Sequence, residues 1–202
     1  IIGSCIIMVG GYLDDKYNLK PSQQVIFPII SSLTAVVGGI HIAFVTNPSG
    51  GVIHVNILIS FIITFLWIMG MMYTTKFLDG LDGLVSGISV IASVIIFIVS
   101  LFWDIERSGT SFMSLSLAGA CLGFLIFNFY PAKIFLGESG SIFLGYVLGI
   151  LSIVSGSKIA TALLIMGFPI IDTFWVIIRR MRQGKSPIRG DRKHFHFSLL
   201  DS

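Results

Sequence analysis

Long apolar runs separated by short polar gaps dominate the chain. They predict helices over residues 1–13, 22–39, 57–75, 84–103, 112–129, 141–155 and 158–178. The first run would rise only about 20 Å as a helix, which is too short to cross a hydrocarbon core of about 30 Å. We therefore expect an all-α, multi-pass integral membrane protein in which residues 1–202 are one domain, truncated at its start and a fragment of a larger helical bundle.

One stretch, residues 40–56, departs from the helical pattern. Its first residues alternate apolar with smaller or polar side chains, a turn sequence follows at Asn47–Gly51, and β-branched residues resume at Val52. Alternation around a turn rich in Gly and Pro is typical of a β-hairpin. We expect a small extracytoplasmic hairpin between two helices.

Composition agrees with a membrane location. Hydrophobic residues make up 54% of the chain and charged residues only 11%, whereas soluble domains carry about 25% charged residues. The net charge of +3 is spread along the chain, so we expect no nucleic-acid partner. Cys5 and Cys121 lie in apolar runs, where cysteine behaves as a small hydrophobic residue.

Threading the predicted crossings places the loops 14–21, 76–83 and 130–140 and the tail 179–202 on one face. That face holds eleven of the 13 Lys and Arg residues: Lys16, Lys20, Lys76, Lys133, Arg179, Arg180, Arg182, Lys185, Arg189, Arg192 and Lys193. The positive-inside rule makes it cytoplasmic. We expect a plasma or inner membrane protein with a cytoplasmic tail segment over 179–202.

Most carboxylates fall at the same face, although the positive-inside rule does not require it. Asp14 and Asp15 follow the first run, and Asp79 and Asp82 lie in a DGLDG sequence expected to begin the helix over 84–103. Carboxylates at membrane level are costly and point to function. Solvated helix ends or an N-cap at Asp79 are the structural alternatives. Hard carboxylate oxygens suit Mg²⁺, with Mn²⁺ as an alternative metal.

Two further polar segments belong to this face. The connection 128–141 carries Asn128, Lys133 and Glu138, which could bind phosphate or a metal, although a plain inter-helix turn is the alternative. The tail carries a DRKHFH sequence whose candidate ligands for phosphate are Arg192, Lys193, His194 and His196. A basic segment next to anionic lipid explains the cations there but not the histidine pair.

These motifs, in this order, resemble those of the polyprenyl-phosphate N-acetylhexosamine-1-phosphate transferases, glycosyltransferase family 4. The matching pieces are Asp14–Asp15, residues 67–83, the NFYPAKIFLGESGS segment over 128–141, PIID at 169–172, and DRKHFH at 191–196. The resemblance implies ten or eleven helices, so helices would be missing at both ends. It also implies the reaction of a UDP-sugar with polyprenyl phosphate to give polyprenyl-diphosphate-sugar and UMP.

The resemblance assigns roles to the candidate residues. Glu138, with Asp15 or another of the aspartates, would hold Mg²⁺, and Asp14, Asp15, Asp79 and Asp82 would be catalytic. Asn128, Lys133 and the four tail residues would bind the UDP-N-acetylhexosamine or the lipid phosphate. It allows a homodimer. The first expected substrate is UDP-GlcNAc, and the alternative is the phospho-MurNAc-pentapeptide transferase branch.

The sequence departs from the family pattern at several polar positions. Glu138 stands where the family has Asp, Tyr73 and Lys76 stand where it commonly has Asn, and Gln24 stands where it has Lys. The terminal motif, usually H-x-H-H, ends in Phe197. Two non-enzymatic readings therefore stay open: an inactive scaffold derived from the family, and a transporter, against which the clustering of acids at one face argues.

Overall fold

The computed structural model describes residues 1–46, 51–103 and 109–155, together with five single positions, Gly167, Ile170, Ile171, Ile178 and Arg182. The predicted helix over 158–178 and the tail over 179–202 lie almost wholly outside the described residues. So do four of the candidate site residues, Arg192, Lys193, His194 and His196.

The described part is helical apart from one hairpin. Its elements are α1 Ile2–Tyr17, α2 Pro21–Gln24, α3 Ile26–Val37, β1 Phe44–Thr46, β2 Val52–His54, α4 Ile57–Leu78, α5 Leu84–Trp103, α6 Gly109–Asn128 and α7 Gly137–Val154. Four segments are long and apolar enough to cross a membrane: α4, residues 84–102 of α5, α6 and α7. The prediction of an all-α, multi-pass membrane protein is confirmed.

The predicted helix over 22–39 is two helices. The chain turns at Val25 between the four-residue α2 and the longer α3. Pro21 opens α2 at the first helical position, where a missing N–H costs nothing. The break gives Gln24 a position at the end of a short helix, apart from the apolar body of α3.

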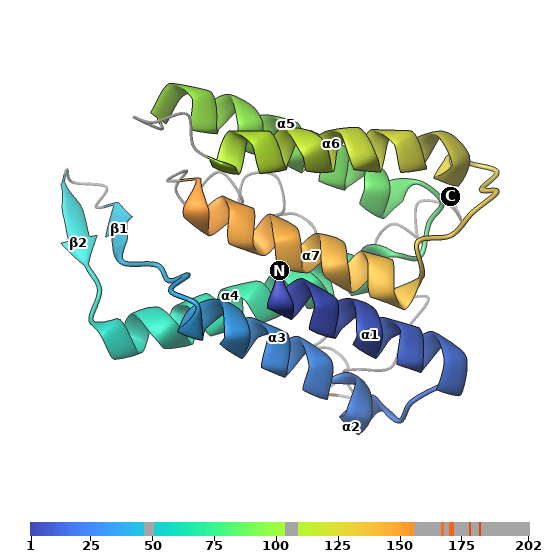
Figure 1. Cartoon of the computed structure of the whole chain (residues 1–202), viewed down its shortest axis with the longest axis horizontal. Coiled ribbons are helices and arrows are strands. Elements are labelled where there is room, and N and C mark those ends of the chain that lie inside the picture. Colours follow the sequence, from blue (N-terminus) through green and yellow to red (C-terminus); the bar gives the residue numbers. More distant parts are fainter. Residues whose placement is uncertain are drawn as a thin grey trace.

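Helix α7 is central to the bundle. It packs against α1 and α4 on one side and against α5 on another, while α5 and α6 form a closely packed pair. Figure 1 shows α7 running between the α5–α6 pair above it and α1, α3 and α4 below it. Anything attached to α7 is therefore positioned by several helices at once.

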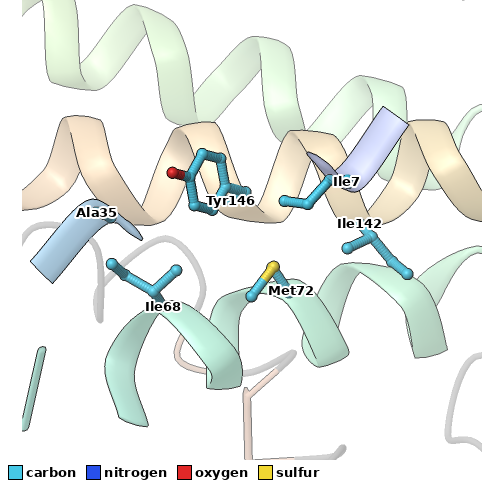
Figure 2. Close-up of a cluster of buried hydrophobic side chains, with 6 residues drawn as sticks. All are labelled: Ile7, Ala35, Ile68, Met72, Ile142 and Tyr146. Carbon is cyan, nitrogen blue, oxygen red and sulfur yellow. The ribbon is translucent and has the colours of Figure 1, made fainter. Parts of the chain in front are cut away.

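A buried apolar cluster joins α7 to three of its neighbours. It contains Ile7, Ala35, Ile68, Met72, Ile142 and Tyr146, one or two side chains from each of α1, α3, α4 and α7 (Figure 2). Such apolar packing holds membrane helices together by van der Waals contact rather than by exclusion of water.

Small residues let the helices approach closely around α7. A Cβ added at Gly11 of α1 would overlap Ser139 of α7, and one added at Gly145 of α7 would overlap Met71 and Thr75 of α4. Small residues at such crossings are typical of membrane helix interfaces. The first crossing fixes the polar end of α1 against the start of α7.

Many buried hydroxyls bond within their own helix. Five of them donate to the carbonyl four residues earlier at 2.7–3.1 Å: Ser32 to Pro28, Thr64 to Ser60, Thr75 to Met71, Ser114 to Thr110 and Ser141 to Gly137. This bonding satisfies a polar group without a partner on another helix.

The hairpin and the polar loops lie at opposite ends of the bundle. Strands β1 and β2 pair antiparallel, as expected, with Phe44 opposite His54. Ser60 of α4 donates to the Ile42 carbonyl at 2.6 Å, which ties the base of the hairpin to α4. In Figure 1 the hairpin is at the left, and the α1–α2 and α6–α7 connections are at the right. The right-hand end is called the polar end below.

Candidate active site at the polar end

The Asp14–Asp15 pair lies in the last turn of α1 rather than after the helix. The helix continues four residues beyond the predicted end and stops at Asn18, a left-handed C-cap with φ 48°. Neighbouring residues on a helix point about 100° apart, so the two carboxylates differ in environment. Asp14 is buried, with 7% of its surface exposed, whereas Asp15 is exposed.

Asp14 is held by two donors from the chain that follows it. Its Oδ1 accepts from the Leu19 N–H at 2.9 Å and from Gln24 Nε2 at 2.9 Å. Gln24 also donates to the Leu19 carbonyl at 3.2 Å. These bonds fix the Asp14 carboxylate toward the interior of the bundle and join the end of α1 to α2.

Glu138 lies in the first turn of α7, where the helix N-terminus favours a negative charge. It forms an ion pair with Lys76, in the last turn of α4, and the two side chains are only 23% and 14% exposed. Lys76 Nζ also donates to Gln24 Oε1 at 3.3 Å. A continuous chain of polar contacts thus runs Asp14–Gln24–Lys76–Glu138; we refer to these four residues as the charged network.

Further observations place Asp14, Asp15 and Glu138 next to one another. The Asp14 and Glu138 carboxyls lie within hydrogen-bonding range of each other, and both line a small cavity with Gln24. Asp15 Oδ2 lies 3.4 Å from the position that a Cβ at Gly137 would take. Asp14, Asp15 and Glu138, which the sequence predicts to act together, are therefore neighbours.

The donor set suits a hard divalent cation. Within the described residues, no group of three or more His, Cys, Asp or Glu side chains converges as a self-sufficient metal site. Mg²⁺ does not need one, because it is usually held by one or two carboxylates, with water and substrate phosphates completing its coordination. The adjacent Asp14 and Glu138 carboxyls fit that requirement, and Asp15 lies close to them.

The Asp79–Asp82 pair is not at the start of a helix, so the expectation that the DGLDG sequence begins the helix over 84–103 is wrong. Asp79 is the C-cap of α4, residues 80–83 form a turn, and α5 begins at Leu84. Gly83 adopts φ +75°, which an L side chain rarely tolerates, so the chain can turn there before α5. The glycines of the DGLDG sequence thus favour a turn over an early helix start.

The two aspartates of this turn have different surroundings. Asp82 Oδ2 accepts from the Ala132 N–H at 3.0 Å, which ties the turn to the α6–α7 connection. Asp79 is exposed as a whole, but the protein on one side of its carboxyl removes part of the hydration, which raises its pKa to about 6, and a hydrogen bond with Ser141 acts in the opposite direction. A carboxyl with a pKa near 6 can exchange a proton near neutral pH, which makes Asp79 a candidate for proton transfer.

Asn128 holds this turn in place. Its Oδ1 accepts from the Gly83 N–H at 3.1 Å and from Ser86 Oγ at 2.8 Å, and its Nδ2 donates to the Ile134 carbonyl at 2.9 Å. The residue is buried, with 6% of its surface exposed. Its amide therefore has a structural role. Lys133, in contrast, is exposed on the same connection.

Sequence reasoning missed Gln24 and Lys76 as members of the site and treated them only as departures from a family pattern. One signal was present, because a lysine at the end of an apolar helix is a charge at membrane level. Its partner could not be found the same way, since Glu138 is 62 residues away in the chain.

Comparison with known proteins supplies the family. The model of "Glycosyl transferase family 4" matches residues 1–156. A probable undecaprenyl-phosphate N-acetylglucosaminyl 1-phosphate transferase of Bacillus subtilis is 37% identical over 98% of this chain and 57% of its own length. A decaprenyl-phosphate N-acetylglucosaminephosphotransferase of Mycolicibacterium smegmatis is 32% identical over 99% of the chain and 55% of its own length.

A third relative comes from another branch. The phospho-N-acetylmuramoyl-pentapeptide-transferase of Prochlorococcus marinus is 30% identical over 98% of the chain and 60% of its own length. The chain spans somewhat more than half the length of these relatives. The match covers α1 to α7 and every described residue of the polar end. The chain therefore belongs to glycosyl transferase family 4.

Proposed function

We propose that the protein transfers an N-acetylhexosamine 1-phosphate, with GlcNAc 1-phosphate as the first candidate, from a UDP-sugar to polyprenyl phosphate. The products would be polyprenyl-diphosphate-sugar and UMP, for cell-wall or surface-polysaccharide synthesis. The observation that carries the proposal is the meeting of Asp14, Asp15 and Glu138 at the polar end of a membrane bundle. The names of the two GlcNAc-phosphate transferase relatives support the same substrates.

The location of the charges suits two substrates of opposite character. A polyprenyl chain requires a bilayer, which α4 to α7 are long and apolar enough to cross, while its phosphate and the nucleotide sugar are water-soluble groups at the membrane surface. A site at helix ends serves both. We infer that this end faces the cytoplasm, because the cationic loops collect there.

In the proposed reaction, an oxygen of the lipid phosphate attacks the β-phosphorus of the UDP-sugar. The new P–O bond forms as the bond from that phosphorus to the bridging oxygen breaks, and the electron pair leaves with UMP. A phosphate monoester has its second pKa near 6, so it is largely dianionic at neutral pH and needs no dedicated base. Asp14 or Asp15 would then orient the attacking phosphate rather than deprotonate it.

The described side chains divide the remaining work. Glu138, with Asp14 or Asp15, would hold Mg²⁺ or Mn²⁺, which when bound neutralises charge on the diphosphate. Lys133 is exposed on the α6–α7 connection and would pair with phosphate from the solvent side. Asn128 has its amide engaged in the scaffold, and its proposed part is to hold the DGLDG turn.

The test is release of UMP by the full-length protein in detergent from UDP-GlcNAc. We expect release that requires both undecaprenyl phosphate and Mg²⁺. Release with UDP-MurNAc-pentapeptide in place of UDP-GlcNAc would favour the second branch, to which the Prochlorococcus relative belongs. No release with either sugar nucleotide, from folded protein, would refute the proposal and favour an inactive scaffold.

A further inference from the structure

The Lys76 ammonium contacts two side chains, either of which could serve as its hydrogen-bond acceptor. Its ammonium pairs with Glu138 of α7 and donates to Gln24 of α2, while its own Cα belongs to the last turn of α4. With 14% of the side chain exposed, the charge is largely withdrawn from solvent. Water screens such a pair much less than it screens a surface pair.

Glu138 has Asp14 as a second neighbour, and the two negative charges together require a positive charge such as the Lys76 ammonium. The carboxyl of Asp14 lies within hydrogen-bonding range of that of Glu138. Two carboxylates at that separation repel each other unless a proton or a cation lies between or beside them. Lys76 supplies one positive charge on the Glu138 side, and Gln24 supplies a neutral donor on the Asp14 side.

The ammonium and a divalent cation would therefore need the same carboxylate. Lys76 contacts Glu138 Oε1, so a metal that binds Glu138 must displace the ammonium or share the carboxylate with it. In the second case a positive charge remains a few ångströms from a doubly positive ion. At the effective dielectric of a partly buried site, that repulsion weakens metal binding by well over tenfold.

We propose that Lys76 is a built-in counter-cation that sets the affinity of the Glu138–Asp14 pair for divalent cations. Without a metal, Lys76 neutralises Glu138 and keeps the two carboxyls together. When a metal binds, Lys76 moves off Glu138 and stays near it through Gln24. The inference rests on the proposed function only in that it concerns the same metal site. Lys76 is in this account a positioning residue and not a catalytic one.

The test is binding of Mn²⁺, measured by electron paramagnetic resonance on the full-length protein in detergent with no substrate present. Lys76→Met removes the charge and keeps most of the stem, so we expect the Kd for Mn²⁺ to fall by about tenfold or more. Lys76→Arg keeps a cation, and its Kd should stay close to that of the wild type. Adding Glu138→Gln to Lys76→Met should abolish the tight binding.

A matched control is available on the same face. Lys16 is exposed, with its ammonium 5.7 Å from the Tyr12 ring centroid and 5.3 Å from that of Tyr17. Lys16→Met removes the same charge two residues from Asp14 in the sequence and leaves the ion pair between Lys76 and Glu138 in place, so we expect no change in the Kd. If thermal unfolding shows that Lys76→Met is not folded, it is replaced by Lys76→Gln, whose amide can still donate to Glu138.

Unchanged or weaker Mn²⁺ binding in the folded Lys76 variants would overturn the inference. So would the absence of saturable Mn²⁺ binding in both the wild type and Lys76→Met, or an equal gain of affinity in Lys16→Met. The readout does not depend on turnover. A protein that releases no UMP but binds Mn²⁺ more tightly after Lys76→Met would refute the proposed function and retain the inference.

Discussion

The polar end has two sides that are built in different ways. On one side, the charged network joins Asp14, Gln24, Lys76 and Glu138 mainly through side chains. On the other, Asn128 and Asp82 bind backbone N–H groups and a carbonyl in the 79–83 turn and the α6–α7 connection. The first side can exchange partners by rotating side chains, whereas the second cannot change without moving the backbone.

The difference separates two tasks within one site. A side that binds ions and phosphates must release one set of contacts to make another, and side-chain contacts allow that. A side that holds loops in register must not change during the reaction, and a buried amide with both of its ends engaged is suited to it. The two sides therefore predict different consequences of mutation: loss of activity on the first and loss of stability on the second.

Glu138→Gln should give the largest loss of activity. Without that loss, the assignment of activity to the charged network and of stability to the other side would be wrong. The variant keeps the shape of the side chain but removes the charge that Lys76 and a metal need. We expect UMP release to fall by roughly 10²- to 10³-fold, as on loss of a charge-stabilising group. The thermal unfolding midpoint should change little by comparison. Glu138→Asp, which keeps a carboxylate, is the control and should retain much more activity.

Asn128→Ala should act mainly through stability. It removes the partners of the Gly83 N–H, Ser86 Oγ and the Ile134 carbonyl. Leaving a buried polar group unpaired costs about 1–3 kcal/mol, so we expect a clear loss of thermal stability in detergent. Lys133→Ala on the same connection is the control, because that side chain is exposed. Full stability together with a selective loss of substrate affinity would instead make Asn128 a substrate ligand.

Asp79→Asn should give the smallest effect, a change in thermal stability, and it tests one residue of the 79–83 turn separately from Asn128. The pKa of Asp79 is raised from 3.8 to about 6, so the folded state holds its proton more tightly than the unfolded state does. Stability is therefore highest below about pH 4 and falls as the pH rises from about 4 to 6. Because Asn cannot ionise, we expect the variant to melt above the wild type at pH 7, by only about 1–2 °C since Asp79 is exposed and solvent reduces the effect.

The two melting temperatures should converge as the pH falls toward 4, where folded Asp79 is protonated and the unfolded carboxyl is near its own pKa of 3.8. Thermal unfolding of both proteins between pH 4 and 7.5 checks this. A gap that stays constant with pH would show that ionisation of Asp79 is not its cause. A gap that grows toward low pH would contradict the raised pKa itself.

Much of the helical framework could be predicted from the sequence, because a bilayer imposes long apolar runs. The helix over 84–103 has its predicted bounds, and the helix predicted over 57–75 extends only three residues further in α4. The hairpin followed from its turn residues. Helix α7 begins four residues before its predicted start, since Gly137 to Gly140 have the composition of a loop although they are the first turn of a helix.

The arrangement of the site could be predicted only in part. That Asp14, Asp15 and Glu138 meet followed from the motifs, but the ion pair between Lys76 and Glu138 depends on how α4 and α7 cross. No local pattern encodes that crossing; it depends on small residues such as Gly145, packed against Met71. For the same reason, the sequence could not distinguish the scaffold role of Asn128 from a substrate contact.

The hydroxyl bonds described above have a consequence for how the protein is made. Thr64 and Ser114 are satisfied within α4 and α6 before any other helix is present, so these helices can enter the bilayer one at a time without carrying unpaired groups into lipid. Lys76 and Glu138 have no such local solution, because each finds its counter-charge on another helix. During biogenesis, the charge of Lys76 in α4 is neutralised by Glu138 only once α7 is present. The charged network is therefore completed only after α7 has been synthesised.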